Sequence, residues 1–166
     1  MACKASPLGS LFSDKMKKLE IELVPKTCWF SNVRSHISQG EWDKLRNDVY
    51  RKANNVCEIC GGVGPKHPVE CHEIWHYDDE THVQRLDGLI ALCPSCHSVK
   101  HIGLTSLNGD IGIAVAHLAK VNGWKSLDAE KYVLQATKTW KERSQHEWKL
   151  DLSWLEQRGI FVKPER

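Results

Sequence analysis

The residues from Cys57 to His101 read CEICGGVGPKHPVECHEIWHYDDETHVQRLDGLIALCPSCHSVKH, and the rest of the chain is expected to be organised around them. It contains two Cys-x-x-Cys pairs, Cys57/Cys60 and Cys93/Cys96. Each pair can present two thiolates to one ion from a single tight turn, so the two pairs together predict a closed tetrahedral zinc site. Two unrelated turns with reduced thiols are the main alternative, and disulfides are a weaker one.

A helix that begins near Pro94 is expected to supply two further metal ligands. Proline is common in the first helical turn, and His97 and His101 would then lie four residues apart on one face of that helix. The four thiolates already fill the coordination sphere of the first ion. The two imidazoles therefore imply a second metal, with additional ligands from elsewhere in the chain.

Those additional ligands are expected on a strand between the two cysteine pairs. The segment 69–75, VECHEIW, reads as a short β-strand that can bring His72 and Glu73 against the helix. A second short apolar strand, 89–92, leads into the second cysteine pair. The polar residues between these strands are expected to form a loop.

Two sequence matches carry a resemblance to a known family. Residues 92–101, LCPSCHSVKH, match a Leu-Cys-x-x-Cys-His-x-x-x-His helix residue for residue, and residues 72–78 read His-Glu-x-Trp-x-Tyr-Asp. Together they resemble the HNH endonucleases, in particular a phage and bacterial subgroup. The resemblance covers the middle third of the chain. It implies an α+β fold with a ββα-metal, treble-clef-like core stapled by zinc and surrounded by flanking helices.

The resemblance also implies a metal-dependent endonuclease that hydrolyses DNA phosphodiester bonds, by nicking or by double-strand cleavage. The expected cofactors are a structural Zn²⁺ on the four cysteines and a catalytic Mg²⁺, Mn²⁺ or other divalent ion on His72, His97 and His101. With Glu73, these histidines make up the expected catalytic residues. The alternative is a zinc-stapled module that binds nucleic acid or protein without cutting it.

The chain departs from the family pattern where a ligand and a general base are expected side by side. The family usually reads His-His or Asp-His, and this chain has His72-Glu73. Matching by order makes His72 the ligand and Glu73 the base. A shift by one residue makes His72 the base and leaves Cys71 as a poor ligand for a hard metal. A third arrangement places Glu70 and His72 on one strand face. The three assignments stay open.

A second departure concerns the loop. The family's middle Asn, which braces the loop before the helix, is absent, and Asp87-Gly88 occupies that region.

Length and charge limit the remaining possibilities. The 166 residues predict a single nuclease-like domain, 19–166, with a metal core at 57–103 and helical support at 111–155, after an N-terminal arm, 1–18, that is expected to be flexible. A net charge of +2 does not by itself indicate a nucleic-acid-binding protein. No apolar run reaches the length needed to span a membrane, so no membrane partner is expected.

Seven cysteines leave three outside the zinc site: Cys3, Cys28 and Cys71. An odd number of cysteines without a signal peptide favours a reducing cytoplasm, here that of a bacterial cell or a phage-infected host. DNA is the expected partner. Arg34 and Lys100 are weak candidates for phosphate contacts.

Outside the core, local patterns predict several elements. Ser38 and Glu41 form a capping box, and Gly103 is expected to end the metal-binding helix. The expected elements are a strand at 19–24, helices at 39–54, 111–121 and 126–144, and a terminal strand or short helix at 148–155.

Overall fold

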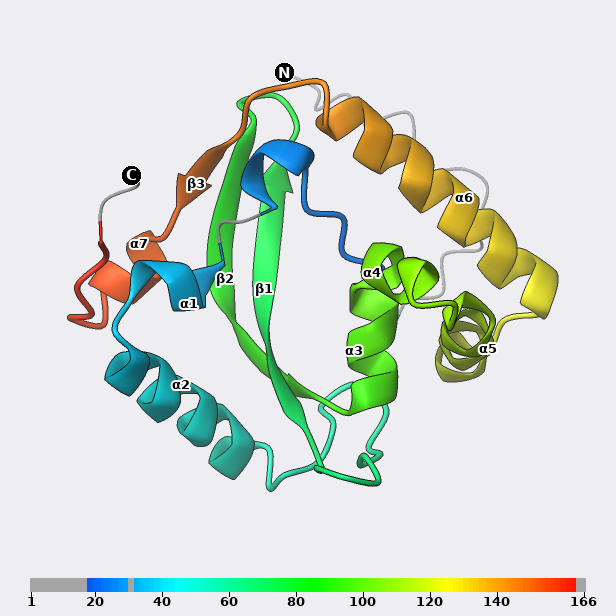
Figure 1. Ribbon diagram of the computed structural model, residues 1–166, viewed down its shortest axis with the longest axis horizontal. Coiled ribbons are helices and arrows are strands. Elements are labelled where there is room, and N and C mark those ends of the chain that lie inside the picture. The colour runs from blue at the N-terminus through cyan, green and yellow to red at the C-terminus, as the bar shows by residue number, and fades with distance from the viewer. Residues whose placement is uncertain (1–17, 30–31, 164–166) are drawn as a thin grey trace, which may run out of the picture.

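The computed structural model describes residues 18–29 and 32–163, and in this part of the chain the fold is α+β, as expected (Figure 1). The arm at 1–18 lies outside the described residues except for Lys18. The elements in chain order are η1 (Lys26–Cys28), α1 (Val33–His36), α2 (Gln39–Lys52), β1 (Glu70–Asp78), β2 (Val83–Leu92), α3 (Pro94–Lys100), α4 (Ile102–Leu107), α5 (Ile111–Asn122), α6 (Ser126–Arg143), β3 (Lys149–Asp151) and α7 (Ser153–Glu156).

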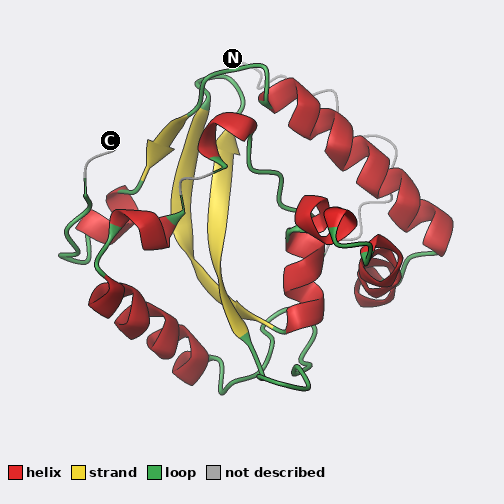
Figure 2. Cartoon of the chain, viewed as in Figure 1, coloured by secondary structure: helices red, strands yellow, loops and turns green. Residues whose placement is uncertain are grey.

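A long antiparallel hairpin of β1 and β2 makes up most of the sheet, and the short β3 lies parallel to the central strand β2 at one edge (Figure 2). Both hairpin strands are longer than the expected strands, because residues 76–78 pair with residues 83–85. The turn itself is confined to the residues after Asp78, whose carboxylate accepts hydrogen bonds from the backbone N–H groups of Glu80 and Thr81.

A β-bulge interrupts the hairpin near its middle. Ile74 pairs with Gly88 and Trp75 pairs with Leu86, so Asp87 has no partner residue on β1. An extra residue of this kind shifts the side-chain alternation of the strand that contains it. As a result Leu86 is buried against the helices on one side of the sheet, whereas Leu92 is buried on the other.

The sheet separates two hydrophobic clusters. Figure 1 shows α3, α5 and α6 on one side of the hairpin and α1, α2 and α7 on the other. Leu92, Val99 and Leu118 lie in the first cluster, together with the buried cysteines of both Cys-x-x-Cys pairs. Leu86 and Leu155 lie in the second.

The capping box at the start of α2 is confirmed. The Ser38 hydroxyl accepts from the Glu41 backbone N–H at 3.2 Å, and a Glu41 carboxylate oxygen accepts from the Ser38 backbone N–H at 3.0 Å. The helix ends at Lys52, slightly before the expected end. Asn54 and Asn55 follow with positive φ and turn the chain into the first cysteine pair.

The expectation that Gly103 ends the metal-binding helix is wrong. Helix α3 ends at Lys100, and Gly103 lies inside the short helix α4. The two helices meet at His101, whose backbone (φ −97°, ψ 43°) departs from helical geometry. The Thr105 hydroxyl donates to the Ser98 carbonyl at 2.7 Å and braces this corner.

The C-terminal expectations are largely confirmed. Helices α5 and α6 occupy the expected ranges, and Gly123 ends α5 in the left-handed conformation with φ 66°. The segment 148–155 contains both of the elements considered for it, because β3 and α7 follow one another.

The segment 19–24 is not a β-strand. It runs beside α3, where the Glu22 backbone N–H donates to the Lys100 carbonyl at 3.2 Å. The Asn122 side chain at the end of α5 holds its start: Oδ1 accepts from the backbone N–H groups of Lys18 and Leu19, and Nδ2 donates to the Leu19 carbonyl at 2.8 Å. A side-chain amide thus provides pairing that a neighbouring strand would otherwise provide.

Replacement of Asn122 by Ala should lower the free energy of unfolding by about 1–3 kcal/mol, because three hydrogen bonds are lost at once. Asn122→Asp should cost less, since the two bonds accepted by Oδ1 remain. Urea denaturation followed by circular dichroism measures both values. Asn108→Ala, at the exposed end of α4, is the matched control and should change stability little. An Asn122→Ala protein as stable as this control would contradict the assigned clamp.

Candidate metal centres

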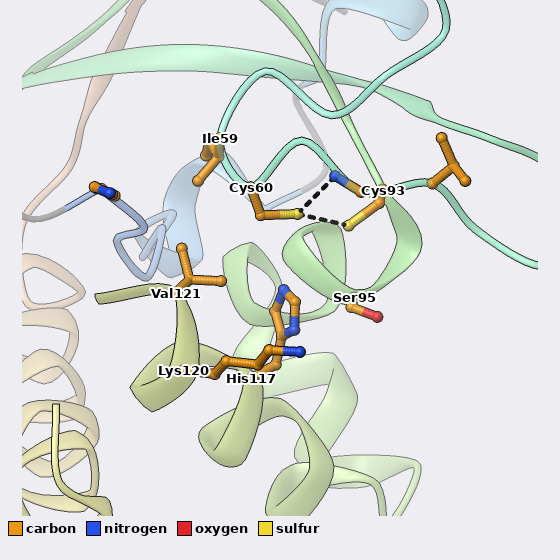
Figure 3. A pocket seen from close by; sticks show the side chains of 10 residues that line it. Ile59, Cys60, Cys93, Ser95, His117, Lys120 and Val121 are labelled. Atoms are coloured by element: carbon orange, nitrogen blue, oxygen red, sulfur yellow. Dashed lines mark hydrogen bonds between the residues drawn. The ribbon is translucent and has the colours of Figure 1, made fainter. Parts of the chain in front are cut away.

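The four cysteines of the two Cys-x-x-Cys pairs form one cluster, as predicted. One sulfur from each lies within 4.8 Å of the others. The Sγ atoms of Cys60 and Cys93 are 3.6 Å apart (Figure 3). This is close to the edge of about 3.8 Å expected for sulfurs placed tetrahedrally around zinc with Zn–S bonds of about 2.3 Å. The cluster could therefore hold a zinc ion.

Two tight local structures present these sulfurs. In the first pair, the Gly61 N–H donates to the Cys57 carbonyl at 2.9 Å, and Gly61 adopts a φ of 73° that favours glycine. In the second pair, Cys93 is the N-cap of α3 and Pro94 is its first residue. Burial raises the pKa of the Cys96 thiol. A metal that binds there must therefore displace a firmly held proton.

A polar pocket of about 510 Å³ borders this cluster, and Figure 3 shows its lining. His117, from α5, has its Nε2 3.2 Å from the Cys96 Sγ. A ring N–H that donates to a zinc thiolate is an outer-shell contact of the kind that tunes metal sites. His117 ties α5 to the cysteine cluster, and the sequence patterns did not single it out.

Three histidines form a second cluster. His72 lies on β1, His97 lies on α3, and His101 follows the last residue of α3. One ring nitrogen from each lies within 4.8 Å of the others, so this group too could hold a metal ion. The ring centroids of His97 and His101 are 4.6 Å apart, and that of His72 is 5.2 Å and 4.9 Å from them. The histidine of the strand and the two histidines of the helix region thus lie close together, as the sequence predicted.

The surroundings of the histidines fit a metal. The buried His72 ring has its Nε2 3.0 Å from a Glu22 carboxylate oxygen, and its Nδ1 has no hydrogen-bond partner in the part of the chain that the structure describes. The Nδ1 of His97 lies 2.5 Å from a Glu70 carboxylate oxygen. Carboxylates on the second ring nitrogen are what orient metal-binding histidines in general. Nδ1 of His72 and Nε2 of His97 are then the nitrogens left for an ion.

The protonation states are also suitable. Burial lowers the pKa of both His72 and His101 to about 3, so their imidazoles are neutral at neutral pH, which is the form that binds metals. Burial raises the pKa of Glu22 to about 7, against the opposing effect of Lys100, whose Nζ is 3.7 Å away. Sequence motifs could not reveal Glu22, because it precedes His72 by 50 residues.

Glu73 does not join the histidines. Adjacent strand residues face opposite sides of a sheet, and Glu73 faces α1, where its Oε1 accepts from the Val33 backbone N–H at 3.3 Å. Burial raises its pKa. Cys71 lies on the same face as Glu73, and its backbone N–H donates to the Tyr50 hydroxyl. Of the three arrangements considered, the structure brings His72 to the other histidines and places Glu70 beside them as an outer contact.

Arg34 and Lys100, the two predicted phosphate contacts, belong to neither cluster. Lys100 is mostly buried, with 17% of its side chain exposed, and it faces Glu22 rather than solvent. Arg34 is exposed on α1 and contributes to the lowered pKa of Asp43, behind the larger effects of Arg46 and Gln39. Asp87, in the region of the missing Asn, binds Arg85 at 2.7 Å.

Comparisons of the chain with models of known families, with curated proteins and with solved structures found no match. Among the described residues, no helix has the length and apolar character that crossing a lipid bilayer requires.

Replacement of Cys96 by Ser should abolish zinc binding at the cysteine cluster and unfold the core around α3. Structural zinc contributes on the order of 10 kcal/mol or more to the folding of small domains. Zinc content is measured by elemental analysis and folding by near-UV circular dichroism. Cys71→Ser is the control, because that thiol lies outside the cluster. A folded Cys96→Ser protein that retains its zinc would contradict the assignment.

A second metal should bind at the histidine cluster, and calorimetric titration of the zinc-loaded protein with Mn²⁺ or Co²⁺ measures it. His97→Ala should remove this binding and leave the protein folded. Glu22→Gln should weaken it roughly 10–100-fold, because the carboxylate orients His72. The exposed His76, also on β1, supplies the control His76→Ala. Equal affinity in wild-type and His97→Ala proteins would exclude the site.

Proposed function

We propose that the protein is a metal-dependent endonuclease that hydrolyses DNA phosphodiester bonds. The observation that supports this best is the trio of His72, His97 and His101, because carboxylates hold two of the rings. The side chain of His97 is 28% exposed to solvent. Three protein ligands leave coordination positions for a substrate, as in catalytic rather than structural metal sites. The resemblance of residues 72–78 and 92–101 to HNH nucleases supports DNA as the substrate.

The chain's own residues would have distinct roles. The three imidazoles hold the ion, and Glu22 and Glu70 keep two of those rings in position. A divalent ion bound there would act as a Lewis acid on the scissile phosphate. Nearby, the cysteine cluster fixes the start of α3, on which His97 lies one residue after Cys96. Placement of the phosphate is thus proposed to depend on both clusters.

The second candidate is a module that binds DNA or protein without cutting it. One observation favours it: the residue at the family's base position, Glu73, faces α1 and accepts a hydrogen bond from the Val33 backbone. If the protein is a nuclease, the proton of the attacking water would therefore pass to solvent or to the substrate and not to Glu73.

Plasmid cleavage tests the proposal. Supercoiled DNA incubated with zinc-loaded protein should be nicked or linearised when Mg²⁺ or Mn²⁺ is added, and His97→Ala should abolish cutting. Glu73→Ala should lower kcat less than the roughly 10²–10⁴-fold loss expected for a general base. His76→Ala is again the control and should cut like the wild type.

Binding of the same DNA, followed by fluorescence anisotropy, separates the two candidates. DNA binding should survive His97→Ala, because phosphate contacts elsewhere supply most of the affinity. If the wild-type protein binds DNA but fails to cut it with every divalent metal tested, the nuclease proposal is ruled out and the binding module is left.

A further inference from the structure

The loop 64–68, immediately before β1, holds one exposed histidine in a fixed position. The Gly64 N–H donates to the Pro68 carbonyl at 2.9 Å and closes the loop. A Cβ at Gly64 would lie 2.3 Å from the His67 carbonyl oxygen and 2.6 Å from Pro94, so only glycine allows the loop to pack on the start of α3. Pro65 and Pro68 restrict the backbone further.

Within this loop, His67 shares a carboxylate with the metal centre. One oxygen of Glu70 lies 2.7 Å from the His67 Nε2, and the other lies 2.5 Å from the His97 Nδ1. The side chain of His67 is 52% exposed, compared with 28% for His97. A single carboxylate therefore fixes one imidazole toward the histidine cluster and a second toward solvent.

We propose that His67 is a substrate-positioning residue that binds the backbone phosphate next to the scissile one. This inference rests on the proposed nuclease function. The contact with Glu70 uses Nε2, so a phosphate oxygen would bind at Nδ1. A protonated imidazole donates from both nitrogens, and its hydrogen bond to a phosphate is charge-assisted.

The geometry favours the neighbouring phosphate over the scissile one. His67 is linked to His97 through the Glu70 carboxylate, which contacts both rings, and His67 is not itself a member of the histidine cluster. A general base must lie within about 3 Å of the proton that it removes, so His67 is too far out for that role. Phosphates repeat along a strand, and the next one along can reach a group placed at the rim of the site. The exposed Lys66 beside His67 adds positive charge there.

The test compares two substrates: a short DNA duplex and bis(4-nitrophenyl) phosphate, a diester with no neighbouring phosphate. His67→Ala should raise KM for the duplex roughly tenfold or more, as expected for loss of a charged hydrogen bond. The defect should be much smaller on the small diester. The slope of log affinity against log salt should decrease by about 0.9, the value for one phosphate contact.

Matched variants distinguish charge from packing. His67→Lys places a cation at this position and should recover most of the DNA affinity, whereas His67→Asn should not. His146→Ala, an exposed histidine near the turn of the hairpin that stacks on His82, should behave as the wild type. Mn²⁺ affinity, measured by calorimetry, should stay within a few-fold of the wild-type value in His67→Ala, because His67 is not a ligand.

A methylphosphonate scan locates the contact. Replacing the phosphate beside the scissile bond with a neutral methylphosphonate should weaken cleavage by the wild type and have little additional effect on His67→Ala. Unchanged KM and salt slope in His67→Ala, with an active wild type, would overturn the role of His67 and leave the nuclease proposal standing. A wild type that hydrolyses neither substrate would overturn the proposed function itself.

Discussion

Helix α3 contributes residues to both the cysteine cluster and the histidine cluster, and this sharing ties the two clusters together. Cys93 caps this helix, Cys96 lies in its first turn, and His97 follows immediately on a different face. Any ion bound by the cysteines therefore fixes the position and rotation of the helix that supplies the histidines. The sheet contributes the opposing surface, because β1 places His72 against α3 and β2 leads directly into Cys93. A displacement of either cluster therefore moves the other, because α3, a helix of two turns, connects them.

The sequence predicted the parts of this arrangement in which short-range spacing determines geometry. Cysteines three residues apart can share a tight turn, and histidines four residues apart on a helix share a face, so both clusters could be located. The capping box before α2 and the glycine after α5 were recognisable for the same reason. Residue spacing locates the two clusters, whereas the nuclease activity depends on which metal and substrate bind there.

What the sequence did not reveal depends on contacts between distant segments. Glu22 contacts His72 and His117 contacts Cys96, each a cluster residue distant in the sequence, and no local pattern marks either contact. Polar and apolar residues alternate in the segment 19–24 as they do in a strand. In the structure, however, this segment is held by side-chain contacts and one backbone hydrogen bond to α3, and not by a ladder of strand hydrogen bonds. Likewise, glycine often ends a helix, and this predicted a helix end at Gly103. The chain instead turns two residues earlier, at His101, where the Thr105 hydroxyl donates to the Ser98 carbonyl.

The anchoring of the N-terminal segment by Asn122 also has a consequence for the order of assembly. The contacts of Lys18 and Leu19 with Asn122 span more than one hundred residues. Contacts of such sequence separation form late and slow the folding of a domain. During synthesis, Lys18 and Leu19 cannot contact Asn122 until α5 has left the ribosome. Glu22 belongs to the same segment, and its own contacts with His72 and with the Lys100 carbonyl likewise need residues that are made much later in the chain.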